Sequence, residues 1–163
     1  MIHIVLIEPE IPPNTGNIAR LCAATGSVLH LVGRLGFRIT DRTLKRAGLD
    51  YWSHVQLVRH PEAKKFWKEL ENENFYLFST HGTLLYSAIR YQDGDYLVFG
   101  RETAGLPAEV LNQFADRTAY IPMDGPVRSL NLSTAAGVVA FEALRQIRGN
   151  LWQIRREPDI NAC

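Results

Sequence analysis

Cysteine is scarce in this chain of 163 residues, which has only Cys22 and Cys163. Two thiols do not make a disulfide scaffold, so the sequence fits a reducing cytosol and we expect a cytoplasmic protein. No apolar run approaches the roughly 20 residues that a membrane span needs. Met1 leads directly into the strand-like HIVLIE without a signal-peptide pattern. We therefore expect neither a secreted protein nor a membrane partner.

Several well-known chemical motifs are also missing. The five histidines show no metal-ligand spacing with one another or with the cysteines, so no metal is expected. The stretch FGRETAGLP contains glycines but is neither a Walker A loop nor a G-x-G-x-x-G fingerprint. No G-x-S-x-G elbow occurs. Glu8 and Glu10 are separated by a proline within a loop and do not read as an acid–base pair.

The formal net charge is only +1, so a nucleic-acid partner would have to be held by local patches rather than by the overall field. The densest basic run is RLGFRITDRTLKRAG, in which a single Asp41 opposes the cations Arg34, Arg38, Arg42, Lys45 and Arg46. Two interpretations remain open for this run. It is either a solvated helix face or a patch that contacts phosphates.

Apolar strand-like runs alternate with helical patterns along the whole chain. This alternation predicts an α/β fold with a mostly parallel sheet and helices on both faces, in one domain over 1–163 with a polar tail from about 150. The predicted strands are 2–7, 28–33, 54–58, 75–80, 96–100 and 117–121. The predicted helices begin near Gly16, at Pro61, at Pro107 and near Asn131. Asn14 or Thr15 is expected to cap the first helix, and Arg20 lies opposite its apolar stripe.

Three loops that leave predicted strands have unusual compositions: 8–16, 100–107 and 121–133. Ligands of open α/β sheets bind at the carboxyl ends of the strands, so these loops are the candidate site. Glycines at 100 and 105 would let the backbone approach a ligand closely. In SLNLS, Asn131 or Ser133 is a natural N-cap, and the helix start that follows favours an anion or an electron-rich ligand. Plain capping is the alternative interpretation.

The three loops together resemble the three motifs of the SPOUT superfamily of RNA methyltransferases. The motifs are PPNTGNIARLC, FGRETAGLP and IPMDGPVRSLNLSTAAGVVAFE, in that order. Within the superfamily the chain is similar to the small tRNA 2′-O-methyltransferases of the TrmL type, which modify the wobble nucleotide. The likeness extends through AGLDYW and YQDGDYLVFG and covers nearly the whole chain. It implies a deep trefoil knot at the C-terminal end of the sheet, a homodimer with the active site between subunits, and S-adenosylmethionine as the methyl donor.

The resemblance also implies residue roles. The donor would be held largely by backbone groups at Phe78, Gly100, Ile121, Ser129 and Leu130. The catalytic residues would be Arg20, Ser129 and Asn131. Because a guanidinium with a pKa above about 12 is a poor base, we expect Arg20 to clamp a phosphate and to steady the developing alkoxide. A solvated helix arginine is the alternative. Glu102 either has a role in the site or caps the helix near Pro107.

The substrate implied by the resemblance is the anticodon loop of tRNA, with methylation of cytidine or uridine at position 34. The 34–46 run, with Arg128 nearer the site, is the expected RNA-binding surface. Phe37, Tyr51 or Trp52 could stack on an unpaired base, although core packing is an alternative for Trp52. One departure is Phe141, where relatives often have tyrosine. Two other functions stay open, namely 2′-O-methylation of another RNA site and noncatalytic RNA binding.

Overall fold

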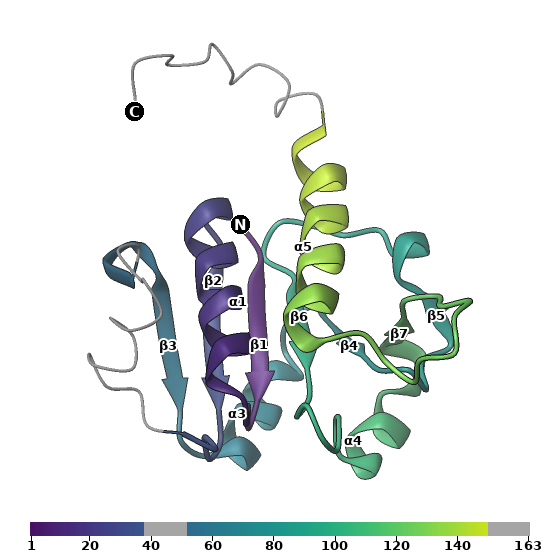
Figure 1. Ribbon diagram of the computed structural model, residues 1–163, viewed down its shortest axis with the longest axis horizontal. Coiled ribbons are helices and arrows are strands. Elements are labelled where there is room, and N and C mark those ends of the chain that lie inside the picture. The colour runs from purple at the N-terminus through teal and green to yellow at the C-terminus, as the bar shows by residue number, and fades with distance from the viewer. Residues whose placement is uncertain (38–51, 150–163) are drawn as a thin grey trace.

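The computed structural model describes residues 1–37 and 52–149, and its centre is a sheet of seven strands (Figure 1). The strand order is β3-β2-β1-β6-β4-β7-β5, and every paired neighbour is parallel. The strands are β1 His3–Ile7, β2 Val28–Val32, β3 Gln56–His60, β4 Phe75–Phe78, β5 Leu84–Leu85, β6 Tyr96–Phe99 and β7 Thr118–Tyr120. The predicted parallel α/β sheet is confirmed. The two-residue β5 was not predicted, and β3 begins two residues after the predicted start.

Helices cover both faces of the sheet, as predicted. The helices are α1 Pro12–Thr25, α3 Ala63–Leu70, α4 Ala108–Gln113 and α5 Leu132–Arg148, with 3-10 turns at Trp52–His54, Tyr86–Ala88 and Ala115–Arg117. On one face, α1 and α5 bury residues such as Ile18 and Val139 against Ile4 and Leu29. On the other face, α3 and α4 pack against Val5 and Leu77. Two apolar layers therefore hold a sheet whose central strands are buried on both sides.

The first helix begins earlier than the sequence predicted. α1 starts at Pro12, its N-cap is Ile11, and no side chain caps it. Proline is tolerated in a first helical turn because the N–H groups there have no partner within the helix. The prediction that Asn14 or Thr15 caps this helix is therefore wrong. Both residues lie inside the first turn and are buried, which frees the Asn14 side chain for another role.

Strand order brings the loops of interest together. β6 lies between β1 and β4, and β7 lies between β4 and β5. All these strands are parallel, so their carboxyl ends meet at one edge of the sheet. The segments that follow β1, β6 and β7 therefore leave from the same edge, together with the exit of β4. α5 begins at that edge and crosses the sheet beside α1 (Figure 1).

Three histidines form a polar row across the face that α3 covers. His3 Nδ1 lies 2.9 Å from His30 Nε2, and His30 Nδ1 lies 2.9 Å from His60 Nε2. Tyr96 stacks on His3, and Phe66 packs against His60. Burial lowers the pKa of all three rings, and that of His30 falls to about 3. Because a neutral imidazole has one N–H, both contacts are satisfied only when all three rings adopt the same tautomer.

This row makes folding stability depend on pH. Below pH 6.5 the unfolded histidines bind protons that the folded row excludes, so stability is complete above that pH and falls as the pH drops. His30 alone should cost about 2 kcal/mol by pH 5, at about 1.4 kcal/mol per pKa unit. We expect His30→Leu to flatten the plot of unfolding free energy against pH between 7 and 5, measured by urea denaturation. The exposed His54→Gln is the control, and an equally steep plot for His30→Leu would contradict the assignment.

Candidate functional site

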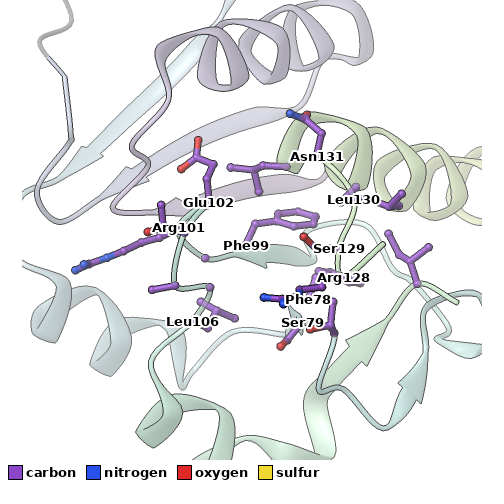
Figure 2. Close-up of a pocket in the computed structure, with 18 of the residues that line it drawn as sticks. Phe78, Ser79, Phe99, Arg101, Glu102, Leu106, Arg128, Ser129, Leu130 and Asn131 are labelled. Atoms are coloured by element: carbon purple, nitrogen blue, oxygen red, sulfur yellow. The ribbon is translucent and has the colours of Figure 1, made fainter. Parts of the chain in front are cut away.

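A cavity of about 850 Å³ opens at the carboxyl edge of the sheet, where the three loops meet (Figure 2). Its walls are Phe78 to His81 after β4, Phe99 to Leu106 around the β6 exit, and parts of the segment 121–132, with Ile11 and Asn14 from the start of α1. Phe78 and Phe99 stack with their ring centroids 5.0 Å apart. The site is therefore a half-apolar pocket built from segments far apart in the sequence.

A carboxylate ties the first loop to the second. Glu102 Oε2 accepts a hydrogen bond from the backbone N–H of Glu10 at 2.8 Å. Its Oε1 accepts from the N–H of Ile11 and from Asn14 Nδ2, both at 3.1 Å. Glu102 therefore does not cap the helix near Pro107, and α4 has no side-chain cap. The side chain instead holds the start of α1 against the β6 exit.

Asn14 carries the same network to the third loop. Its Oδ1 accepts from Asn131 Nδ2 at 2.9 Å. Asn131 Oδ1 in turn accepts from the backbone N–H groups of Ser133 at 2.9 Å and Thr134 at 3.4 Å, and from the Ser133 hydroxyl at 2.7 Å. Of the two predicted N-caps, Asn131 and Ser133, the structure has Asn131 at the start of α5. The same side chain also joins loops that lie 117 residues apart.

Two further contacts reinforce the junction between the first and second loops. Glu8 forms an ion pair with Arg101. Its backbone has a φ of +47°, a left-handed conformation that non-glycine residues rarely adopt. Glu10 Oε2 accepts from the Thr103 backbone N–H at 3.1 Å and from the Thr103 hydroxyl at 2.7 Å. The two glutamates are thus used as ties between loops and not as an acid–base pair.

Gly100 lies where its loop folds back on itself. Its backbone lies against the backbone of Gly105, further along the same loop. A Cβ at Gly100 would lie 2.1 Å from the carbonyl carbon of Gly105. Arg101 and Gly105 close this loop with two backbone hydrogen bonds of 3.0 and 2.9 Å. Gly105 has a φ of +66°. Gly100 therefore lets its own loop close tightly at the pocket wall, while a Cβ on Gly105 would meet nothing within 4 Å.

The structure brings most of the predicted site residues into this cavity. Those that line it are Phe78, Gly100, Ile121, Arg128, Ser129, Leu130 and Asn131. Arg20 is exposed on α1, and within the described residues it lies outside the lining. Arg34 is exposed after β2 and also lies outside it. Arg38, Arg42, Lys45 and Arg46 lie outside the residues that the structure describes, as does Tyr51.

Sequence reasoning missed one wall of the pocket. Ser79, Thr80 and His81, which follow β4, line the cavity. The sequence signal for this wall was Gly82, a glycine that ends the segment after β4. The structure explains it, because a Cβ at Gly82 would lie 2.4 Å from the carbonyl carbon of Ala119. Of the aromatic candidates for base stacking, Trp52 packs against the core and Phe37 is half-buried. Among the described residues, no group of three or more His, Cys, Asp or Glu side chains is arranged to hold a metal ion.

Residues 1–141 match the SpoU rRNA Methylase family. The chain belongs to that family. It is 49% identical over 148 residues to the tRNA (cytidine(34)-2'-O)-methyltransferase of Escherichia coli (strain K12), which covers 90% of this chain and 94% of that protein. No helix among residues 1–37 and 52–149 is long and apolar enough to cross a membrane.

Solved structures agree with the family assignment. A structure from work on the 2-OH methylation of C/U34 on tRNA superposes with a TM-score of 0.84 at 51% identity, covering 90% of this chain and 95% of that one. The SpoU methyltransferase AviRb from Streptomyces viridochromogenes, in complex with the cofactor AdoMet, gives a TM-score of 0.75 at 27% identity. That match covers 88% of this chain and 59% of AviRb.

The Glu102 tie can be tested through the amides that it binds. In Glu102→Gln, one acceptor oxygen becomes a donor NH2, so at least one of the Glu10 and Ile11 amides loses its acceptor. We expect faster hydrogen exchange at these two amides and a loss of roughly 1–3 kcal/mol in unfolding free energy. Glu62→Gln, at an exposed position before α3, is the control. Unchanged exchange at both amides would show that the carboxylate does not hold the loop.

Proposed function

We propose that this protein uses S-adenosylmethionine to methylate the ribose 2′-hydroxyl of the wobble nucleotide, cytidine or uridine at position 34, in tRNA. The observation that carries the proposal is the junction of the three loops through Glu102, Asn14 and Asn131 around one cavity. The name of the Escherichia coli relative supplies the target nucleotide. Membership of the SpoU rRNA Methylase family supports the class of reaction.

The cavity suits the methyl donor. At about 850 Å³ it lies within the roughly 300–1,000 Å³ of small-molecule sites. Its apolar walls offer aromatic and aliphatic surface for a flat base, and backbone groups of the loops can read the edge of that base. The residues proposed to hold the donor are Phe78, Gly100, Ile121, Ser129 and Leu130, and all five line the cavity.

The donor supplies a methyl group that is already activated on a sulfonium. The chain must therefore mainly position the ribose and help its hydroxyl to lose a proton. We assign Arg20 to clamp the adjacent phosphate and to stabilise the developing alkoxide. Asn131 orients the reactants from the N-terminus of α5, while Ser129 contacts the donor or the ribose. Asn131 retains one amide N–H beyond its bond to Asn14, which leaves it a donor for this role.

The position of Arg20 favours a site completed by a second subunit. Asn14 lines the cavity, but Arg20 lies six residues further along α1, about 9 Å along the helix axis. Large apolar side chains remain exposed near α1 and on α5, with Ile11 at 42% and Phe141 at 48%. A homodimer would cover such surface, and Arg20 of the partner subunit would then reach the cavity. We propose this arrangement.

The remaining features of the proposal concern RNA, topology and location. Arg34 is the exposed arginine proposed to contact the anticodon loop, together with Arg38, Arg42, Lys45 and Arg46 outside the described residues.

We also propose a deep trefoil knot at the C-terminal end of the sheet, which the insertion of β6 and β7 between earlier strands supports. The chain would form a single domain over 1–163 and act in the cytoplasm.

The reaction itself is tested with methyl-labelled donor and total tRNA. We expect label in the tRNA, at the 2′-oxygen of nucleotide 34, when digested nucleosides are mapped by mass spectrometry. Label in a base would contradict 2′-O-methylation. Label confined to ribosomal RNA would favour methylation of another site, while donor and RNA binding without label would favour a noncatalytic role.

The composite site predicts a specific rescue. We expect Arg20→Ala to keep its fold and donor binding but to lose turnover by roughly 100-fold or more. Asn131→Ala should also be inactive, and its loss of the cap, worth roughly 1 kcal/mol, is measured alongside. Mixing the two inactive variants should restore about a quarter of wild-type activity, because half of the dimers are hybrids with one intact site. No recovery would place Arg20 in the site of its own subunit.

A further inference from the structure

One charged side chain in the cavity wall has not been accounted for. The charged residues among the lining are Arg101, Glu102 and Arg128. Arg101 is paired with Glu8, and Glu102 accepts three hydrogen bonds. Arg128 forms no hydrogen bond or ion pair within the described part of the chain. Arg128 is exposed, so solvent can satisfy its guanidinium, and the side chain is available to bind an anionic group of a ligand.

The surroundings of Arg128 are those of the donor pocket. Figure 2 labels Arg128 among the residues that line the pocket, together with Phe78, Ser79, Glu102 and Asn131. Ser129 follows Arg128 in sequence, and Thr80 also lines the cavity. The hydroxyl groups of Ser79, Thr80 and Ser129 therefore line the same cavity as the guanidinium.

Two anions could meet this side chain, the α-carboxylate of the donor or a phosphate of the RNA. Ser129, which follows Arg128 in the sequence, and Phe78, which lines the same cavity, are among the residues proposed to hold the donor. The phosphate beside the reacting ribose is already assigned to Arg20, whereas the carboxylate of the donor has no assigned partner. A guanidinium also matches a carboxylate through two parallel N–H···O bonds. The donor carboxylate is thus the better match.

We propose that Arg128 binds the α-carboxylate of the donor's amino-acid moiety, which rests on the function proposed above. The sequence had placed Arg128 on the expected RNA-binding surface, as the basic residue nearer the site. On the present assignment it fixes the end of the donor that lies away from the base, and so sets where the methyl group points. Arg128 is then a binding residue for the donor and a specificity determinant for ligands that carry an amino-acid tail.

Calorimetry with two ligands separates this role from others. S-adenosylhomocysteine carries the carboxylate, whereas 5′-methylthioadenosine has the same nucleoside and sulfur but lacks the amino-acid moiety. We expect Arg128→Gln to raise the Kd of the full-length protein for S-adenosylhomocysteine by roughly 10- to 100-fold, as for other hydrogen bonds to charged groups. The Kd for 5′-methylthioadenosine should stay within about 2-fold of the wild-type value, since that ligand offers nothing for the guanidinium to bind.

The controls make each outcome decisive. Arg128→Lys should recover part of the affinity for S-adenosylhomocysteine, and the exposed Arg90→Gln should change neither Kd. An unchanged Kd for S-adenosylhomocysteine in Arg128→Gln, or an equal loss for both ligands, would overturn the proposal. Weaker binding of tRNA alone would assign Arg128 to phosphate instead. If the wild-type protein binds neither ligand, the proposed donor is wrong as well, and that failure is distinguishable from the others.

Discussion

The Glu102 carboxylate is the interaction on which the rest of the site depends. Its two oxygens accept from three donors of the segment that leads into α1. From α5 the donors all point one way: the Ser133 N–H to Asn131, Asn131 to Asn14, and Asn14 to Glu102. The start of α5, with its partial positive charge, lies at one end and the carboxylate lies at the other. The common direction of these hydrogen bonds fixes the orientation of the Asn14 and Asn131 side-chain amides. The bonds also keep the three loops in contact with one another.

The sheet explains why such short contacts can join distant residues. β1 and β6 are neighbours, and β4 separates β6 from β7, so three exits are presented within a few strand widths. The segment that follows β4 lies between the exits of β6 and β7, and its residue Ser79 lines the pocket. Each loop is then shaped locally, by a strained Glu8 in the first and by the touching backbones of Gly100 and Gly105 in the second. The strand order thus places the loops at one edge of the sheet, and the side chains then shape the pocket between them.

Local signals in the sequence were sufficient for some features and not for others. The Asn131 cap depends on residues within one helical turn, and it is one of the two caps predicted. The partners of Glu102 lie 88 to 92 residues away, and no local pattern identifies them. α1 was started too late because prolines were interpreted as loop residues, although a first helical turn accepts them. β5 has two half-buried residues, too few for an alternation to be recognised.

The placement of β6 has a consequence for how the chain is made. β1 has β2 as its partner on one side, but its other partner ends at Phe99, more than ninety residues later. Until β6 has been synthesised, the backbone N–H and C=O groups on one edge of β1 therefore have no strand to pair with. β6 must then enter between β1 and β4, and β7 must follow between β4 and β5. Such late insertion favours slow folding, and the edge of β1 stays open to pairing with other chains until β6 arrives.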